Sequence, residues 1–429
     1  MNKNIKLAVA GAVLALSATA NAGIIIPAGD WTLDIGGNVN TYVTSTRNTG
    51  TSTTGYATLW SGAGNGDQLL APTAVPNKST ANITTGLLPN YLSVSGTTRQ
   101  NDLDVAFTIS INPGSSTTAS GIQSARQENR QAFLTFGDKS WGSIKLGKDL
   151  GIFASDAILN DMTLLGVGSG AGGLAGNTTT TGRIGTGFMY ADWKAQAAYT
   201  TPNFGGFQAT VGTTQAWDAW SNIVAAGATA GDAVSAGRGG SQNAYEGKAS
   251  YSFAANDVTG KIWVSGMYQK VENLYTKSWD GSATTTSAKL TGADDNVWAT
   301  DIGANVNVAG FGFTGYYYTG EGIGQTVQMN GGFDRAGKTR DSKGGYVQAT
   351  YVLPTKTKLG LSWGESKLEK NGSGDTMTAN LEDSMWAAGL YHPLTKHLNL
   401  VAEYSDVESK YGTATAKGRT GSLGAILFF

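Results

Sequence analysis

The sequence predicts an all-β protein, a 16-stranded antiparallel transmembrane β-barrel. Three observations lead to this fold class: the composition, a two-residue alternation of apolar and polar residues, and connections that alternate between short and long. Of the 429 residues, 61 are glycine, 10% are aromatic and only 14% are charged, whereas soluble domains carry about 25% charged residues. This composition suits a large β-structure with an apolar outer surface and fits a soluble α/β enzyme poorly.

Charge and cysteine content exclude several classes of function. The 30 basic and 31 acidic residues give a net charge of -1, which lacks the basic excess of nucleic-acid-binding domains. We therefore expect no nucleic-acid partner. The absence of cysteine excludes disulfides, a thiol nucleophile and thiolate metal sites. With only two histidines, we also predict no metal site and no cofactor.

The N-terminal residues have the features of a signal peptide. Two lysines near the start precede an apolar run from Leu7 to Ala20, which leads into the small-residue cleavage pattern Ala-Asn-Ala. The alternative is a membrane anchor, but a spanning helix needs about 20 apolar residues and this run is shorter. We predict that residues 1–22 are cleaved on export and that residues 23–429 form a single barrel domain.

A two-residue alternation predicts the strands. Between residues 31 and 43 the apolar side chains fall mostly on odd positions and the polar ones on even positions. The same pattern returns around residues 103–111, 359–363 and 398–404. Such alternation is typical of a strand with one apolar and one polar face, and a helical pattern competes with it only within residues 150–168.

The connections between the strands sort by length. Seven tight turns are expected at Arg99–Asp102, Asp138–Gly142, Thr201–Gly205, Ala255–Asp257, Val308–Gly310, Pro354–Lys356 and His392–Lys396. Eight long segments rich in glycine, serine, threonine and asparagine are expected at about 45–86, 112–126, 150–184, 217–242, 272–294, 321–342, 368–382 and 407–417. Fifteen connections join sixteen strands, with both chain ends at the short-turn side.

An even strand number with short turns at one rim is typical of a transmembrane barrel. The expected strands of about 9–12 residues are long enough to cross a membrane when tilted. A soluble sandwich or propeller is the alternative, but its strands are shorter. Aromatic residues near the strand ends predict two girdles at the membrane interfaces. They are Trp31, Trp193, Tyr199, Phe204, Phe207, Trp298, Tyr317, Trp363, Trp386, Tyr391 and Tyr404.

Three stretches of the sequence resemble a known family. The C-terminal SLGAILFF, with Phe429 last and Leu427 on the same face, resembles the assembly signal of bacterial outer-membrane barrels. Together with Glu128–Gly151 (ENRQAFLTFGDKSWGSIKLGKDLG) and Tyr199–Phe207 (YTTPNFGGF), it resembles the trimeric 16-stranded porins of Gram-negative bacteria. The resemblance implies the cell outer membrane as location, contact with outer-membrane lipid, a homotrimer, and insertion by the barrel-assembly machinery.

The resemblance also implies that the third long loop, Asp149 to about Gly182, folds inward and narrows the lumen. Strand phase predicts lumen-facing positions for Lys145, Glu246, Lys248, Asp301, Lys358 and Glu403. Phase does not place Arg130, which matches a lumen arginine of the family, and Arg126 and Glu128 share its face. The predicted constriction and pore-lining residues are Arg126, Arg130, Lys145, Asp149, Asp156, Asp161, Glu246 and Lys248.

The same loop carries apolar residues whose role the sequence leaves open. Ile158, Met162 and Leu165 have the spacing of a short helix packed on the inner wall. A path for sugars or apolar solutes is the alternative interpretation.

Catalytic motifs lack the context that they need, so we predict that the protein is not an enzyme. His392 and His397 flank a short turn, where solvated rim residues are more common than metal ligands. Gly360–Gly364 (GLSWG) matches G-x-S-x-G, but it lies inside an alternating strand without the strand–turn–helix of a nucleophile elbow. The glycine-rich run Gly168–Gly176 follows no βαβ unit and is therefore no dinucleotide fingerprint.

The predicted function is a passive channel. Sixteen strands enclose a water-filled lumen, and charges at its narrowest point select among ions and small hydrophilic solutes. A substrate-selective channel for a sugar or organic acid, an outer-membrane barrel enzyme and an adhesin are the alternatives. The sequence does not decide between cation and anion preference, because the loop acids and the wall arginines act in opposite directions.

Overall fold

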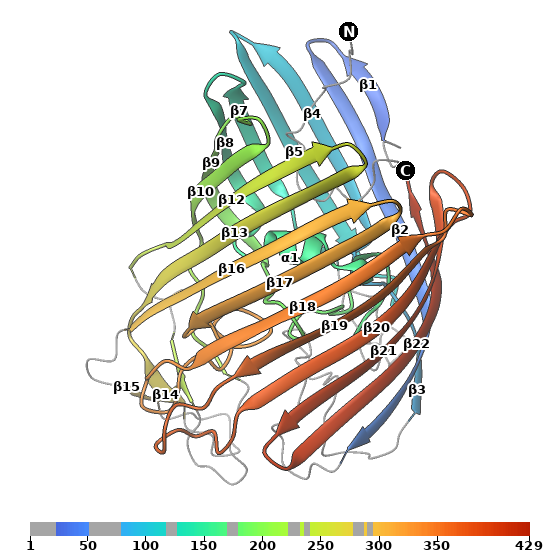
Figure 1. The fold of residues 1–429 in the computed structure, drawn as a ribbon. Helices are drawn as coiled ribbons and strands as arrows, with labels where there is room; N and C mark the ends of the chain where they lie inside the picture. Colours follow the sequence, from blue (N-terminus) through green and yellow to red (C-terminus); the bar gives the residue numbers. More distant parts are fainter. Residues whose placement is uncertain are drawn as a thin grey trace.

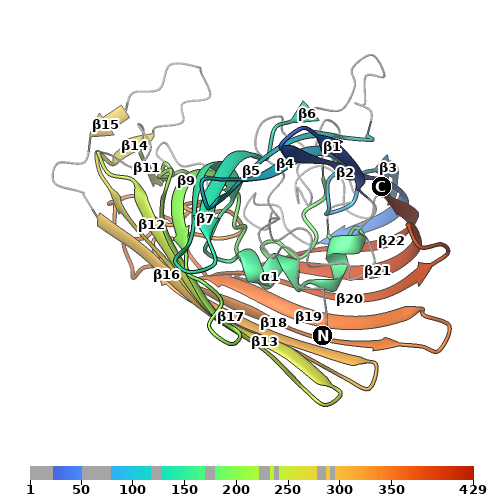
Figure 2. The same ribbon diagram turned by 90° about the horizontal axis from the view of Figure 1, so that it is seen from above.

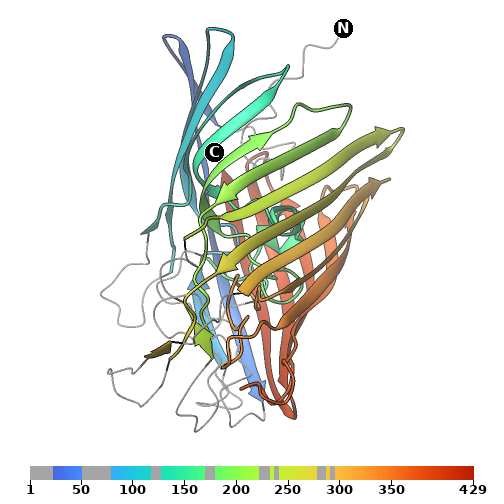
Figure 3. The same ribbon diagram turned by 90° about the vertical axis from the view of Figure 1, so that its left-hand side faces the viewer.

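The computed structural model describes residues 23–50, 79–116, 127–169, 179–221, 232–235, 241–277, 287–289 and 295–429. Most of these residues belong to one antiparallel sheet that closes on itself as a barrel (Figures 1 and 3). Its wall strands are β2 (Trp31–Gly50), β4 (Tyr91–Gln100), β5 (Leu103–Pro113), β7 (Ala132–Asp138), β8 (Gly142–Leu150), β9 (Trp193–Thr200), β10 (Phe207–Thr214), β12 (Ala244–Ala255), β13 (Val258–Val271), β16 (Asp295–Val308), β17 (Phe311–Glu321), β18 (Asp341–Val352), β19 (Lys358–Leu368), β20 (Leu381–Pro393), β21 (Leu398–Tyr411) and β22 (Ala414–Phe428). This confirms the predicted sixteen-stranded antiparallel barrel.

Six short strands complete the description of the sheets. β3 (Ser79–Thr84) continues β4 alongside β2, and β6 (Gln127–Glu128) continues β7 alongside β5. β1 (Ile24–Ala28), which the sequence pattern did not predict, pairs with the start of β2. β11 (Ala233–Val234), β14 (Tyr275–Lys277) and β15 (Ser287–Lys289) form a separate small sheet.

The barrel closes where the last strand meets the first wall strand. β22 pairs with β2 from Asn38↔Phe428 to Gly50↔Ala416. At the end of this ladder Gly37 and Phe429 exchange two backbone hydrogen bonds, with N–O distances of 2.8 and 3.0 Å. Closure leaves no open edge in the wall, which a sheet in hydrocarbon requires because unpaired backbone groups find no partner there.

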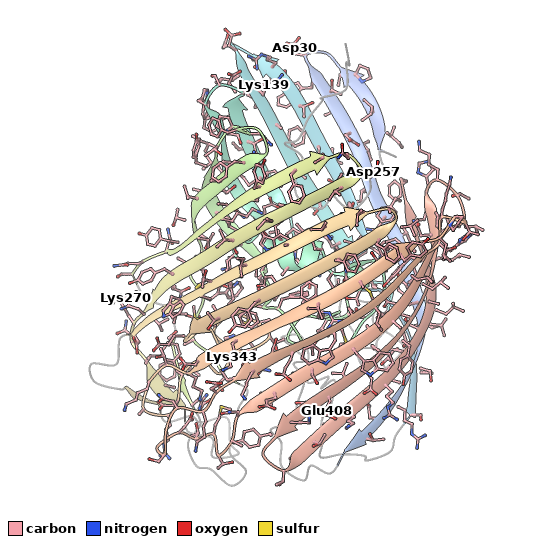
Figure 4. The ribbon with its side chains drawn as sticks, in the orientation of Figure 1. Asp30, Lys139, Asp257, Lys270, Lys343 and Glu408 are labelled. Atoms are coloured by element: carbon pink, nitrogen blue, oxygen red, sulfur yellow. The ribbon has the colours of Figure 1, made fainter. Side chains whose placement is uncertain are left out.

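The predicted short turns lie at one rim of the barrel. Asn101, Asn256 and Ala309, each in a turn between consecutive strands, adopt positive φ angles of 48°, 52° and 49°. Two of them are asparagines, which tolerate the left-handed conformation better than most residues. Figure 4 shows Lys139 and Asp257, both at short turns, toward one end of the barrel, and Lys270 and Glu408 toward the other.

One predicted loop is a tight hairpin instead. The sequence predicts a long connection at 407–417, but β21 extends to Tyr411 and β22 begins at Ala414. Two ion pairs link the extended strands, from Arg419 to Asp406 at 3.0 Å and from Lys417 to Glu408. Polar composition suggested a loop here, because a strand that extends beyond the membrane carries polar residues on its outer face as well.

The two faces of the wall differ as the alternation predicts. On β2 the Val39 side chain is 55% exposed on the outer surface, whereas its neighbours Asn38 and Asn40 are each 1% exposed and face inward. Tyr199, Phe204, Phe207, Trp298, Tyr317, Trp363, Trp386 and Tyr404 are exposed as a girdle requires. Tyr391 is not part of a girdle: it is 2% exposed, because it shares the inward phase of Met385 and Ala387.

The apolar core lies inside the barrel. The connection between β8 and β9, residues 151–192, contains α1 (Ser155–Leu159) and the 3₁₀ helix η2 (Met162–Leu165). Figure 2 shows α1 within the ring of strands. Phe153, Ala157 and Phe188 of this connection are fully buried and join a core cluster with Trp263 and Tyr346 of the wall. Neither of these helices is long and apolar enough to cross a membrane.

Candidate functional site

The connection 151–192, which we call the β8–β9 segment, is held by carboxylates of the wall strands. At its start, Glu246 of β12 accepts hydrogen bonds from the backbone N–H groups of Ile152 (2.7 Å) and Phe153 (2.9 Å). The other carboxylate oxygen of Glu246 pairs with Lys194 of β9 and accepts a hydrogen bond from Thr214. Lys194 and Glu246 have no exposed side-chain surface, so each neutralises a charge that would otherwise be buried alone.

Asp156 ties α1 to two neighbouring strands. Its carboxylate forms an ion pair with Lys248 of β12 at 3.1 Å and a second one with Lys261 of β13. Lys248 also donates a hydrogen bond to the Ser155 hydroxyl at 3.0 Å. Burial alone would raise the pKa of Asp156, but the two ammonium groups outweigh it and lower the pKa below its ordinary value.

Two side chains of β18 hold the middle of the segment. The Tyr346 hydroxyl donates to the Ala157 carbonyl at 2.8 Å. The Gln348 amide donates to the Asn160 carbonyl at 3.0 Å and accepts from the Met162 N–H at 2.7 Å. Backbone groups at the end of α1 and at the start of η2 are thereby satisfied by the wall, as buried polar groups require.

Asp161 and Arg183 form a pair inside the segment. Asp161 caps η2 by accepting a hydrogen bond from the Thr163 N–H at 3.0 Å, and the Arg183 Nε lies 3.8 Å from its carboxylate. Burial raises the pKa of Asp161 and lowers that of Arg183, because desolvation of both charges outweighs their mutual attraction. Arg183 also donates to the Met385 carbonyl of β20 at 2.9 Å.

A second wall carboxylate binds the far part of the segment. Glu403 of β21 accepts hydrogen bonds from the N–H groups of Val167 (2.6 Å) and Gly168 (2.9 Å), and from the Tyr391 hydroxyl. Tyr42 of β2 donates to the Leu165 carbonyl at 2.6 Å. Side chains from opposite parts of the wall therefore contact the segment.

The remaining predicted site residues behave differently from one another. Lys145 and Asp149, both on β8, form an ion pair, and Asp149 accepts a hydrogen bond from Gln131 at 3.0 Å. Arg130 instead pairs with Glu128 at 2.8 Å, and its guanidinium lies 5.7 Å from the centre of the Trp193 ring. Arg126 lies outside the described residues.

The contacts of Arg130 with Glu128 and Trp193 are local, so its expected position opposite the loop acids stays a prediction. Arg130 is 7% exposed and lies between β6 and β7, where the pairing with β5 shifts by one residue from Asn112↔Glu128 to Ile109↔Ala132, so the phase of β7 does not extend to it.

Three cations of the site were missing from the prediction. Lys194 on β9 and Lys261 on β13 occupy inward positions that strand phase could have identified, because their sequence neighbours alternate with them in exposure. Arg183 lies in an irregular connection, where no period in the sequence indicates the direction of a side chain.

A second connection is also buried. Residues 322–334, between β17 and β18, are all buried although they form a long connection. Thr326 accepts a hydrogen bond from the Tyr190 N–H of the β8–β9 segment at 2.9 Å, and Gln328 accepts one from Lys194 at 2.7 Å. Gln325 donates to Asp383 of β20 at 2.8 Å. We call residues 322–340 the β17–β18 segment.

Arg340 fastens this second segment to two other connections. Its guanidinium forms ion pairs with Asp232 (2.9 Å) and with Asp375, and it donates to the Gly331 carbonyl at 2.8 Å. Burial alone would lower the pKa of Arg340, but the two carboxylates outweigh it and raise the pKa above its ordinary value. One buried side chain therefore links three connections at the long-connection rim.

Ser362 and His392 have separate partners in this arrangement. Ser362, the serine of the G-x-S-x-G match, lies on β19 and accepts a hydrogen bond from Arg183. His392 shares a 2.9 Å hydrogen bond with Thr357. Within the described residues, no three histidine, aspartate or glutamate side chains gather in a geometry that suits a metal ion.

Comparison with solved structures identifies barrels of the same fold. The outer membrane channel DcaP of Acinetobacter baumannii matches with a TM-score of 0.65 and 15% identity, over 94% of this chain and 99% of that chain. OmpT of Vibrio cholerae matches with a TM-score of 0.57 and 14% identity, over 95% and 100% of the two chains. OmpF of Salmonella typhi, in a complex with daunomycin, matches with a TM-score of 0.53 and 14% identity, over 94% and 100%.

Comparison with curated protein sequences gave no match. The family model described as Gram-negative porin, in contrast, matches residues 7–412, nearly the whole chain. The closed barrel, its apolar outer face and the polar side chains on its inner wall agree with an outer-membrane channel for passive diffusion. The protein therefore belongs to the Gram-negative porin family.

Proposed function

We propose that the channel admits ions and small hydrophilic solutes and that charges along the β8–β9 segment set its selectivity. A barrel of sixteen strands is wide enough for an aqueous passage, so an element inside the wall must determine what passes. The single observation that carries this proposal is the ring of wall contacts to the segment, from Glu246 at its start to Glu403 at its far part. A segment tied on opposite sides cannot swing out of the lumen without breaking buried hydrogen bonds.

The residues proposed to line this passage come from the segment and the adjacent wall. They are Lys145, Asp149, Asp156, Asp161, Glu246 and Lys248. Charged groups near a narrow point act strongly on ions because low-dielectric walls focus their field. Arg126 and Arg130 complete the proposed set, and Arg130 is buried beside Glu128.

We further propose the state in which the channel works. Residues 1–22 act as a cleaved signal peptide, and residues 23–429 insert through the barrel-assembly machinery, with Phe429 and Leu427 as the assembly signal. The mature chains form a homotrimer in outer-membrane lipid. The pairing of Phe429 with Gly37 supports the importance of the last residue, because it completes the closing ladder.

Planar-bilayer recording tests this proposal directly. Mature protein is refolded, inserted into a lipid bilayer and recorded under a KCl gradient. Conductance in three equal steps that rises in proportion to salt concentration is the expected result for a trimer of water-filled pores. A folded barrel that resists SDS until it is heated but carries no current would contradict the channel and would favour an adhesin or a barrel enzyme.

A substrate-selective channel is the second candidate, and one observation favours it. The β17–β18 segment is buried from residue 322 to residue 334 and contacts the β8–β9 segment through Tyr190 and Thr326. Two buried segments leave less room for solvent than one. Small conductance that saturates with salt, or that one sugar or organic acid blocks, would support this candidate over a general diffusion pore.

A further inference from the structure

We propose that Lys248 and Lys261 form a binding site for small anions at the β8–β9 segment, so that the channel passes anions in preference to cations. The inference rests on the proposed function and assigns a substrate class to its site. Lys248 of β12 and Lys261 of β13 reach the same carboxylate, that of Asp156 in α1. Two positive charges therefore meet one negative charge at the point where the segment touches the wall.

Exposure decides which of these charges a solute meets. The side chains of Lys248 and Lys261 are 21% and 33% exposed, whereas Asp156 is 6% exposed. The pair on β8 repeats this asymmetry, with Lys145 28% exposed and Asp149 6% exposed. In both places the ammonium group faces the solvent and the carboxylate lies behind it.

The lysines also keep hydrogen-bond donors for a ligand. An ammonium group carries three N–H donors. Within the described part of the chain, Lys261 directs one of them to Asp156, whereas Lys248 directs one to Asp156 and one to Ser155. Two donors on Lys261 and one on Lys248 remain for solvent or for an anion such as a carboxylate or phosphate.

The carboxylates of the site, in contrast, already have protein donors. Glu246 accepts from two backbone N–H groups, Thr214 and Lys194. Asp301 of β16 is 3% exposed and accepts hydrogen bonds from Ser265 and Tyr316. A passing cation would have to displace these donors, because their lone pairs are directed into the protein.

Ion selectivity of designed variants tests the site. We expect the wild-type channel to pass chloride in preference to potassium under a KCl gradient. Lys248→Gln and Lys261→Gln should each lower the chloride-to-potassium permeability ratio about fourfold, the effect of a unit charge roughly 5 Å from an ion in a water-like dielectric. Asp156→Asn should raise the ratio, because it leaves both lysines and removes their negative partner.

Controls separate electrostatics from damage to the fold. Lys139→Gln removes a lysine from the exposed turn between β7 and β8 and should leave the ratio unchanged, and Lys261→Arg should preserve it. Inorganic phosphate should reduce chloride current through the wild type and do so less through the Lys248→Gln/Lys261→Gln double variant.

Three sets of outcomes would overturn the inference in different ways. A conducting wild type that prefers potassium, or an equal ratio in the lysine variants and the wild type, would remove the anion site and leave the channel intact. Shifts of the same sign in Asp156→Asn and the lysine variants would indicate a disturbed segment and would also contradict the site. A folded barrel without conductance would contradict the proposed function and the inference with it.

Discussion

Glu246 shows how one side chain can position a functional segment. One of its carboxylate oxygens binds the backbone where the β8–β9 segment leaves the wall, and the other holds Lys194. Strand phase predicted that Glu246 faces the lumen, and its 4% exposure and contacts agree with an inward direction. Its partners were not predictable, because Ile152 and Lys194 approach it only after distant strands have paired.

Replacing Glu246 should destabilise the barrel. Glu246→Ala leaves the Lys194 ammonium buried without its partner, and breaking a buried ion pair on one side costs about 3–5 kcal/mol. The unfolding free energy can be measured by guanidinium denaturation in detergent micelles with tryptophan fluorescence. Glu369→Ala, which removes a partly exposed partner of Lys343, is the control and should change the free energy by at most about 1 kcal/mol. Similar losses in both variants would show that Glu246 is no anchor.

The ionised Asp156 carboxylate should stabilise the fold down to acidic pH. Its pKa is lowered from the ordinary value of 3.8, because Lys248 and Lys261 outweigh the effect of burial. A lowered folded-state pKa means that the ionised carboxylate stabilises the fold above pH 3.8, and that this contribution is lost as the pH falls through the lower folded value.

We therefore expect the stability difference between wild type and Asp156→Asn to stay constant from pH 7 to about pH 4. Below that pH the difference should shrink as Asp156 takes up its proton. Denaturation curves at a series of pH values provide the measurement. A difference that already declines between pH 7 and pH 5 would mean that the two lysines do not hold Asp156 ionised.

The strands could be predicted from the sequence, whereas the structure of some connections between them could not. Alternation located the strands and their tight turns because a strand exposes its side chains in a fixed two-residue period. No such period in the sequence indicated the hairpin between Tyr411 and Ala414. None indicated that residues 322–334 are buried. Their polar residues suggested solvated loops, whereas the structure satisfies many of those polar groups with other connections.

Arg340 should control how firmly the β17–β18 segment is held. Arg340→Gln leaves Asp232 and Asp375 close together without their shared cation. Loss of a buried ion-pair partner costs about 3–5 kcal/mol. Only part of this cost should lower the free energy of local opening of the segment. We therefore expect the backbone amides of residues 322–334 to exchange with solvent about a hundredfold faster. Hydrogen exchange followed by mass spectrometry measures this.

Arg335→Gln is the matched control, because Arg335 belongs to the same segment and is exposed. Its exchange rates should equal those of the wild type. Unchanged protection in Arg340→Gln would show that contacts such as Gln325–Asp383 and Lys194–Gln328 hold the segment without the arginine.

The whole molecule depends on a single closing ladder. Connection lengths predicted sixteen strands, because an even number follows once both chain ends lie at the short-turn side. The contact that closes the ring was not visible in the sequence, since Gly37 and Phe429 meet only in the finished barrel. The apolar outer surface, by contrast, follows from the alternation alone.

Gly37 should be essential for closure because the ladder leaves no space for a side chain there. A Cβ atom at position 37 would lie 2.1 Å from the Tyr91 carbonyl oxygen and 3.1 Å from the Phe429 ring. Gly37→Ala must therefore shift the backbone, and overpacking of this kind costs about 1–3 kcal/mol. Gly315→Ala in β17 is the control, since a Cβ there meets no atom within 4 Å. Refolding into detergent, followed by SDS gels of unheated and heated samples, should give less folded barrel for Gly37→Ala than for Gly315→Ala. Equal yields and equal unfolding midpoints would show that closure tolerates a wider gap between β2 and β4.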